Sequence, residues 1–122
     1  MTKPRETSAL VDALVALIDP YVDRLRLVPS SSMACYTETK GKSYKGSGMM
    51  FAAVRDGKAY TSYHFFPLYL WPEMIDELSP ALRKRMQGKT CFNFRAVDTV
   101  LFAELRELTE RGFERYEAAG YL

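Results

Sequence analysis

The stretch MMFAAVRDGKAYTSYHFFPLY, residues 49–69, decides the fold expected of this 122-residue chain. Two runs rich in aromatic and β-branched residues flank the dipeptide Asp56-Gly57. Such a dipeptide between apolar runs is typical of a tight β-hairpin, because glycine adopts a positive φ without steric cost. The stretch therefore predicts a hairpin with strands over residues 48–55 and 58–66.

Further strands are predicted on both sides of the hairpin. The residues around Arg26 alternate between polar and apolar, and Phe92 and Phe94 alternate with Cys91 and Asn93, as in a strand with two different faces. The additional strands are expected over residues 24–28, 33–39 and 89–94, which gives five strands in all.

Apolar spacing and end signals predict four helices. Ser79 followed by Pro80 marks a helix start, and Gly88 fits the left-handed position that closes a helix. Asp98 is expected to cap the final helix, whose apolar residues recur every three to four positions. The helices are predicted over residues 5–18, 72–78, 80–87 and 99–118.

This order of elements predicts an α+β fold. A mainly antiparallel five-stranded sheet is expected, with the N-terminal helix, two short helices and the long C-terminal helix packed on it. Residues 1–122 have the length of a single domain.

Composition narrows the classes of function. The net charge of +2 is low for a dedicated nucleic-acid binder, so nucleic acid is an unlikely partner. No apolar run is long enough to span a bilayer, and the first residues lack the pattern of a signal peptide. We therefore expect a cytoplasmic protein with no membrane partner and with both thiols reduced. One histidine and two distant cysteines cannot supply a zinc site, so we predict no metal and no cofactor.

Three segments carry a family resemblance. They are MQGKTCFNF at residues 86–94, YTSYHFFP at residues 60–67 and LFAEL at residues 101–105. Together they resemble small bacterial proteins distantly related to the YdhG-like domain family. The resemblance implies an α+β domain with helices packed on a curved antiparallel sheet. Some YdhG-like proteins are described as frataxin-like iron chaperones, but the acidic ligand cluster that such a role needs is not evident here, and no catalytic residues are carried over.

The strongest candidate site lies on the hairpin and the last strand. His64, the only histidine, shares a strand face with Tyr60 and Ser62, and its ordinary pKa of about 6.5 suits acid–base chemistry. Cys91 and Asn93 lie together on one face of the last predicted strand. If the two strands are neighbours, these five residues form a candidate ligand-binding surface. The alternative interpretation is a structural histidine beside an inert cysteine.

A second candidate site is a run of basic residues that could bind an anion. Arg83, Lys84, Lys89 and Arg95, with Arg85 between them, would have to converge in space. The alternative is a solvated helix face, as for most runs of charge.

Three functions remain open. The favoured one is a non-catalytic module that binds a small molecule or a protein partner, with a homodimer as a further possibility. The first alternative is a small enzyme that uses His64 with Cys91 or Tyr60 as acid, base or nucleophile. The weaker alternative is binding of an anion or a nucleic acid through the basic residues.

Overall fold

The computed structural model describes residues 7–41 and 48–122 of the chain. Its centre is one antiparallel sheet of six strands in the order β1-β2-β3-β4-β6-β5. The α+β prediction is confirmed, whereas the predicted number of five strands is wrong. The strands are β1 (Leu25–Leu27), β2 (Cys35–Thr39), β3 (Met50–Asp56), β4 (Thr61–Phe65), β5 (Met86–Gln87) and β6 (Cys91–Phe94).

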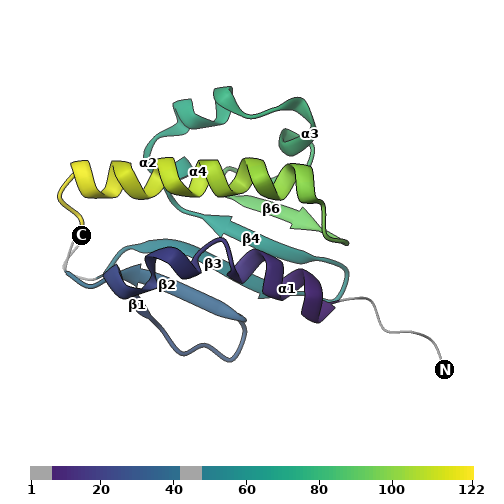
Figure 1. Ribbon diagram of the computed structural model, residues 1–122, viewed down its shortest axis with the longest axis horizontal. Coiled ribbons are helices and arrows are strands. Elements are labelled where there is room, and N and C mark those ends of the chain that lie inside the picture. Colours follow the sequence, from purple (N-terminus) through teal and green to yellow (C-terminus); the bar gives the residue numbers. More distant parts are fainter. Residues whose placement is uncertain (1–6, 42–47) are drawn as a thin grey trace.

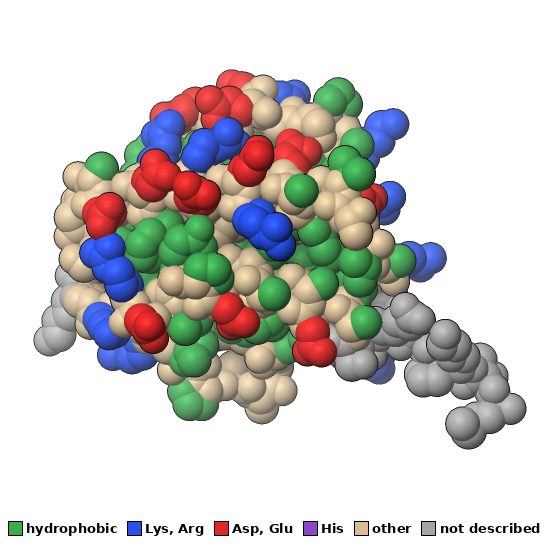
Figure 2. Space-filling view, viewed as in Figure 1, with side chains coloured by type: hydrophobic (Ala, Val, Ile, Leu, Met, Phe, Trp, Pro, Cys, Tyr) green, Lys and Arg blue, Asp and Glu red, His purple; other side chains and the backbone are tan. Residues whose placement is uncertain are grey.

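The two longer helices lie against the same face of the sheet (Figure 1). Residues of both helices line a shallow seam between them, and acidic side chains gather on the outer surface along α4 (Figure 2). The helices are α1 (Thr7–Val15), α2 (Pro67–Leu70), α3 (Pro80–Arg83) and α4 (Thr99–Ala118), with 3₁₀ helices η1 (Asp19–Arg24) and η2 (Pro72–Glu77). The first helix is shorter than predicted. Residues 5 and 6 lie outside the described residues, α1 ends at Val15, and η1 begins at Asp19 with Pro20 in its first turn.

The predicted hairpin is present as β3 and β4, but the expectation that its glycine adopts a positive φ is wrong. The strands pair from Ala52 with Phe65 to the last pair at Asp56, and residues 57–60 join them. Gly57 does not have a positive φ. Glycine is required there by close approach instead, because a Cβ would lie 2.8 Å from the carbonyl oxygen of Tyr60. The N–H of Gly57 donates to that same oxygen at 3.0 Å.

The sixth strand replaces the second half of a predicted helix. Residues 80–87 were expected to be helical, but α3 ends after one turn and β5 pairs with β6. The N–H of Asn93 donates to the carbonyl of Arg85 at 2.8 Å, so pairing with β6 satisfies the backbone that a helix would otherwise satisfy. Gly88 has φ +73°, as predicted, but it forms the turn between these strands and not a helix end.

The C-terminal helix is confirmed, with its cap and its core face. The Asp98 carboxylate accepts from the N–H of Leu101 at 3.0 Å. Gly112 is buried, and its missing side chain lets α4 approach Phe65 of the sheet. The hydroxyl of Tyr63 is 2.7 Å from that of Thr109, so β4 and α4 are joined by a buried hydrogen bond as well as by apolar packing.

One irregularity in the pairing of β2 with β3 changes the direction in which the following side chains point. The pairing of β2 with β3 is irregular between Tyr36 and Glu38. Both Phe51 and Ala52 belong to the core under the helices, although they are neighbours in the strand. A β-bulge allows this, since it adds one residue to a strand and turns the following side chains. Ala53 and the residues paired with it face the other side of the sheet, here called the open face.

Candidate functional site

Antiparallel pairing sets one row of side chains across the open face. Tyr36 pairs with Ala53, Ala53 with His64, His64 with Cys91, and Cys91 with Gln87. Residues paired directly across antiparallel strands point to the same side of the sheet. Since β4 and β6 are neighbours, His64 and Cys91 lie side by side, as the sequence-based hypothesis required.

Hydrogen bonds join the polar side chains of the open face into one network. The Ser62 hydroxyl donates to Asn93 Oδ1 at 2.8 Å, and the Cys91 thiol lies 3.4 Å from the same oxygen. Asn93 Nδ2 donates to Gln87 Oε1 at 2.7 Å, and the Tyr60 hydroxyl donates to that oxygen at 3.2 Å. The structure thus brings all the predicted ligand-binding residues together on one surface. Their role in binding stays a prediction.

Burial favours the neutral forms of the histidine and the cysteine of this face. Cys91 Sγ lies 4.0 Å from His64 Nε2, at the limit of a sulfur hydrogen bond. Burial lowers the pKa of His64, and the positive charge of Arg55 lowers it further. Burial also raises the pKa of the Cys91 thiol, although Arg55 opposes this shift. A thiolate–imidazolium pair is therefore disfavoured near pH 7, and a thiol is a poor nucleophile.

A shallow hollow of about 330 Å³ adjoins the network at the β3–β4 turn. The charged residues that line it are Arg55 and Lys58, and their side chains lie beside the hydroxyl residues Tyr60 and Ser62. No carboxylate lines this hollow, and no salt bridge to either cation is found between described residues. Positive charge beside hydroxyl donors is the chemistry that binds carboxylates and phosphates.

The predicted anion site is only partly assembled. Lys84 and Arg95 line two neighbouring hollows near the start of α4, and Arg85 lines both. Lys89, by contrast, lies in the β5–β6 turn, at the opposite end of β6 from Arg95. The Arg83 guanidinium donates to the backbone carbonyl of residue 76 at 2.8 Å. The basic residues therefore do not converge on one site, because Lys89 and Arg95 lie beyond opposite ends of β6.

Sequence reasoning missed three residues of the open face. Gln87 was assigned to a helix, and it becomes part of the network only because β5 pairs with β6. Arg55 and Lys58 flank the hairpin turn and were treated as strand and turn residues. In the structure Arg55 pairs with Ser62, a register set by the connection over residues 57–60 and not by the two-residue turn expected from the sequence.

Neither a metal centre nor a membrane span is found in the described part of the chain. Among residues 7–41 and 48–122, no group of three or more His, Cys, Asp or Glu side chains could hold a metal ion. No helix in these two ranges is long and apolar enough to cross a membrane. The candidate chemistry thus rests on the neutral network and the two cations beside it.

The fold and the site define an α+β protein with helices on one face of its sheet and a polar, hydrogen-bonded surface on the other. No family model matches the chain, and neither the curated proteins nor the solved structures contain a match. The resemblance to YdhG-like domains therefore stays a prediction.

Proposed function

We propose that the protein is a non-catalytic binding module whose open face holds a small molecule with an anionic group. The observation that carries this proposal is the lining of the turn hollow, where Arg55 and Lys58 lie beside the hydroxyl residues Tyr60 and Ser62. A carboxylate or phosphate placed there gains charge-assisted hydrogen bonds, which are stronger than bonds between neutral groups. An acidic segment of a partner protein offers the same chemistry and is the second ligand of this proposal.

The polar network supports binding rather than catalysis. Three hydrogen bonds link Tyr60 to Gln87, Ser62 to Asn93 and Asn93 to Gln87, and they hold these side chains in place before a ligand arrives. Preorganisation of this kind reduces the entropic cost of binding. The compartment belongs to the same proposal: Cys35 and Cys91 are free and lie on opposite faces of the sheet, which suits the reducing cytoplasm.

The enzyme alternative rests on the contact between His64 and Cys91. Nucleophilic catalysis needs a thiolate, whereas burial raises the pKa of Cys91. The alkylation rate of Cys91 as a function of pH, measured in a Cys35→Ser variant, decides between the readings. A midpoint above the ordinary thiol value of 9.0 supports an inert thiol, and a midpoint below neutrality would favour the enzyme.

Binding is tested by NMR titration of the full chain with matched probe pairs, benzoate against benzamide and phenyl phosphate against phenol. We expect the anions to shift the signals of Tyr60, Ser62 and His64, and the neutral partners to leave them unchanged. Arg55→Gln should weaken anion binding about tenfold or more, the usual value of a hydrogen bond to a charged group. Arg111→Gln, an exposed arginine of α4, is the matched control and should have no effect.

Two results would overturn the proposal. One is equal binding of the neutral and the anionic member of each pair, which would remove the role of charge. The other is an equal loss of affinity in the Arg55 and Arg111 variants, which would indicate nonspecific attraction to positive charge. Shifts produced only by acidic peptides, and not by the small anions, would select the partner protein over the small molecule.

A further inference from the structure

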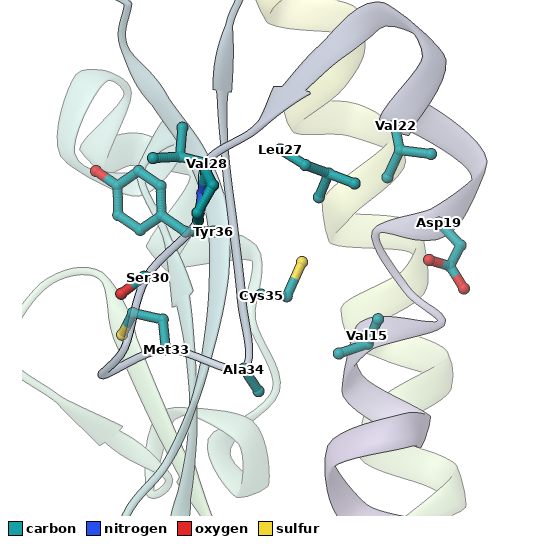
Figure 3. A pocket seen from close by; sticks show the side chains of 11 residues that line it. Val15, Asp19, Val22, Leu27, Val28, Ser30, Met33, Ala34, Cys35 and Tyr36 are labelled. Atoms are coloured by element: carbon teal, nitrogen blue, oxygen red, sulfur yellow. The ribbon is translucent and has the colours of Figure 1, made fainter.

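A larger hollow lies at the edge of the sheet formed by β1 and β2, beside the corner between α1 and η1. Its volume is about 570 Å³, within the range of small-molecule sites. Figure 3 shows Cys35, Leu27, Val22, Asp19 and Val15 around it. The residues that line it are Val15, Asp19, Val22, Leu27, Val28, Pro29, Ser30, Met33, Ala34, Cys35 and Tyr36.

The hollow exists because the edge strand β1 extends beyond the part of the sheet that the helices cover. Leu27 pairs with Thr37, which is fully buried on the helix-covered face, so Leu27 belongs to that face as well. Yet Leu27 is 58% exposed. The chain has turned from α1 into η1 at this point, and no helix of the described residues packs over Leu27. The apolar side chain of Leu27 is therefore left uncovered at the sheet edge, beside the apolar residues Val15 and Val22 that also line the hollow.

The polar groups of the hollow set the charge of an occupant. Asp19 is its charged lining residue, and no lysine or arginine lines it. The Asp19 carboxylate makes no hydrogen bond or salt bridge to another described residue. Burial raises the pKa of the half-buried Cys35 thiol, and the negative charge of Asp19 raises it further. The same field attracts a cation and repels an anion.

We propose that this hollow binds a small amphipathic cation, with an apolar body against Val15, Val22 and Leu27 and a positively charged nitrogen beside Asp19. The volume and the apolar lining of the hollow favour a ligand with a small apolar body. The carboxylate of Asp19 favours a positively charged group at one end of that ligand. The site is distinct from the hollow at the β3–β4 turn, because no residue lines both. Cys35 pairs with Val54 on the helix-covered side, whereas Cys91 lies on the open side.

The test uses hexyltrimethylammonium as the probe, with n-hexanol as the neutral partner and n-hexanoate as the anion. Methyl NMR of the full chain should show shifts at Val15, Val22 and Leu27 with the cation, with a dissociation constant of about 1 mM for a probe of this size. Hexanol should bind more weakly, and hexanoate more weakly still.

Two matched variants locate the charge. Asp19→Asn should weaken binding of the cation by up to about fivefold and leave hexanol unchanged, which is the upper end for an ion pair at an exposed carboxylate. Asp23→Asn, an exposed carboxylate of the same 3₁₀ helix outside the hollow, should change neither.

Alkylation supplies a second readout. In a Cys91→Ser variant, iodoacetamide should modify Cys35 more slowly when the cation is bound, while hexanoate gives no protection. The proposal is overturned if hexanoate binds as well as the cation, if the two aspartate variants lose affinity equally, or if millimolar cation leaves these methyl signals and the alkylation rate unchanged.

Discussion

Replacement of Gly112 by alanine tests how closely α4 approaches the sheet. The glycine lies in the middle of a 20-residue helix and is fully covered. A Cβ built at this position would overlap the ring of Phe65, with Phe65 Cε2 at 2.9 Å and Pro67 Cγ at 3.0 Å. The Phe65 ring cannot move aside, because the rings of Phe51 and Tyr63 pack against it at centroid distances of 5.4 and 6.0 Å. Alanine must therefore push the helix away from the sheet.

Two opposing terms set the magnitude. Alanine in place of glycine inside a helix stabilises it by about 1 kcal/mol. Overpacking of a core without room to relax costs about 3 kcal/mol, the upper end of the usual range, because the obstructing ring is fully buried. The net loss is then about 2 kcal/mol, which for a chain of this size lowers the melting temperature by about 8 °C.

Urea unfolding followed by circular dichroism measures this loss, with two further variants as controls. Ala103→Gly, at an exposed position of the same helix, reports the helix-propensity term alone and should cost about 1 kcal/mol. Phe65→Leu in the Gly112→Ala background should recover part of the loss, so that the double variant is less destabilised than the sum of the singles. A Gly112→Ala protein more stable than the parent by about 1 kcal/mol would refute the close-contact argument.

Three further predictions concern single groups. The folded-state pKa of His64 lies below its ordinary value of 6.5, so stability should fall as the pH drops through 6.5, and His64→Gln should remove this part of the pH dependence of urea midpoints. Tyr63→Phe deletes a buried hydrogen bond to Thr109 and should cost about 1 kcal/mol in the same assay, whereas an unchanged midpoint would show that the bond contributes nothing. Gly88→Ala should cost about 1 kcal/mol in thermal unfolding and Gly88→Asn less, because φ is +73° and a Cβ there meets no other atom.

The sequence predicted those elements whose signals are local. Asp98 and Ser79 cap helices because a short polar side chain can reach the N–H two or three residues ahead, and both contacts are present. The long final helix has a continuous apolar stripe, and the hairpin has two strands that alternate around a turn. In each case the residues that decide the structure lie within a few positions of one another.

Elements set by distant contacts were not predictable in the same way. Residues 80–87 carry a good helix start and a glycine at the right distance, yet the chain leaves the helix because β6 offers Met86 and Gln87 a pairing partner. The bulge at Phe51 likewise depends on the register of β2. The candidate site was anticipated in part, since alternation placed Ser62 and His64 on one face. Gln87 joined it only through the unpredicted strand.

Tyr63 in β4 and Tyr60, the residue before this strand, have hydroxyl groups in contrasting surroundings. The Tyr63 hydroxyl is fully buried and hydrogen-bonded to Thr109, so a ligand cannot reach it. The Tyr60 hydroxyl donates to Gln87 on an exposed surface that a ligand can reach. The buried hydrogen bond of Tyr63 therefore belongs to the core, and the proposed ligand recognition is assigned to the open face, where the Tyr60 hydroxyl lies.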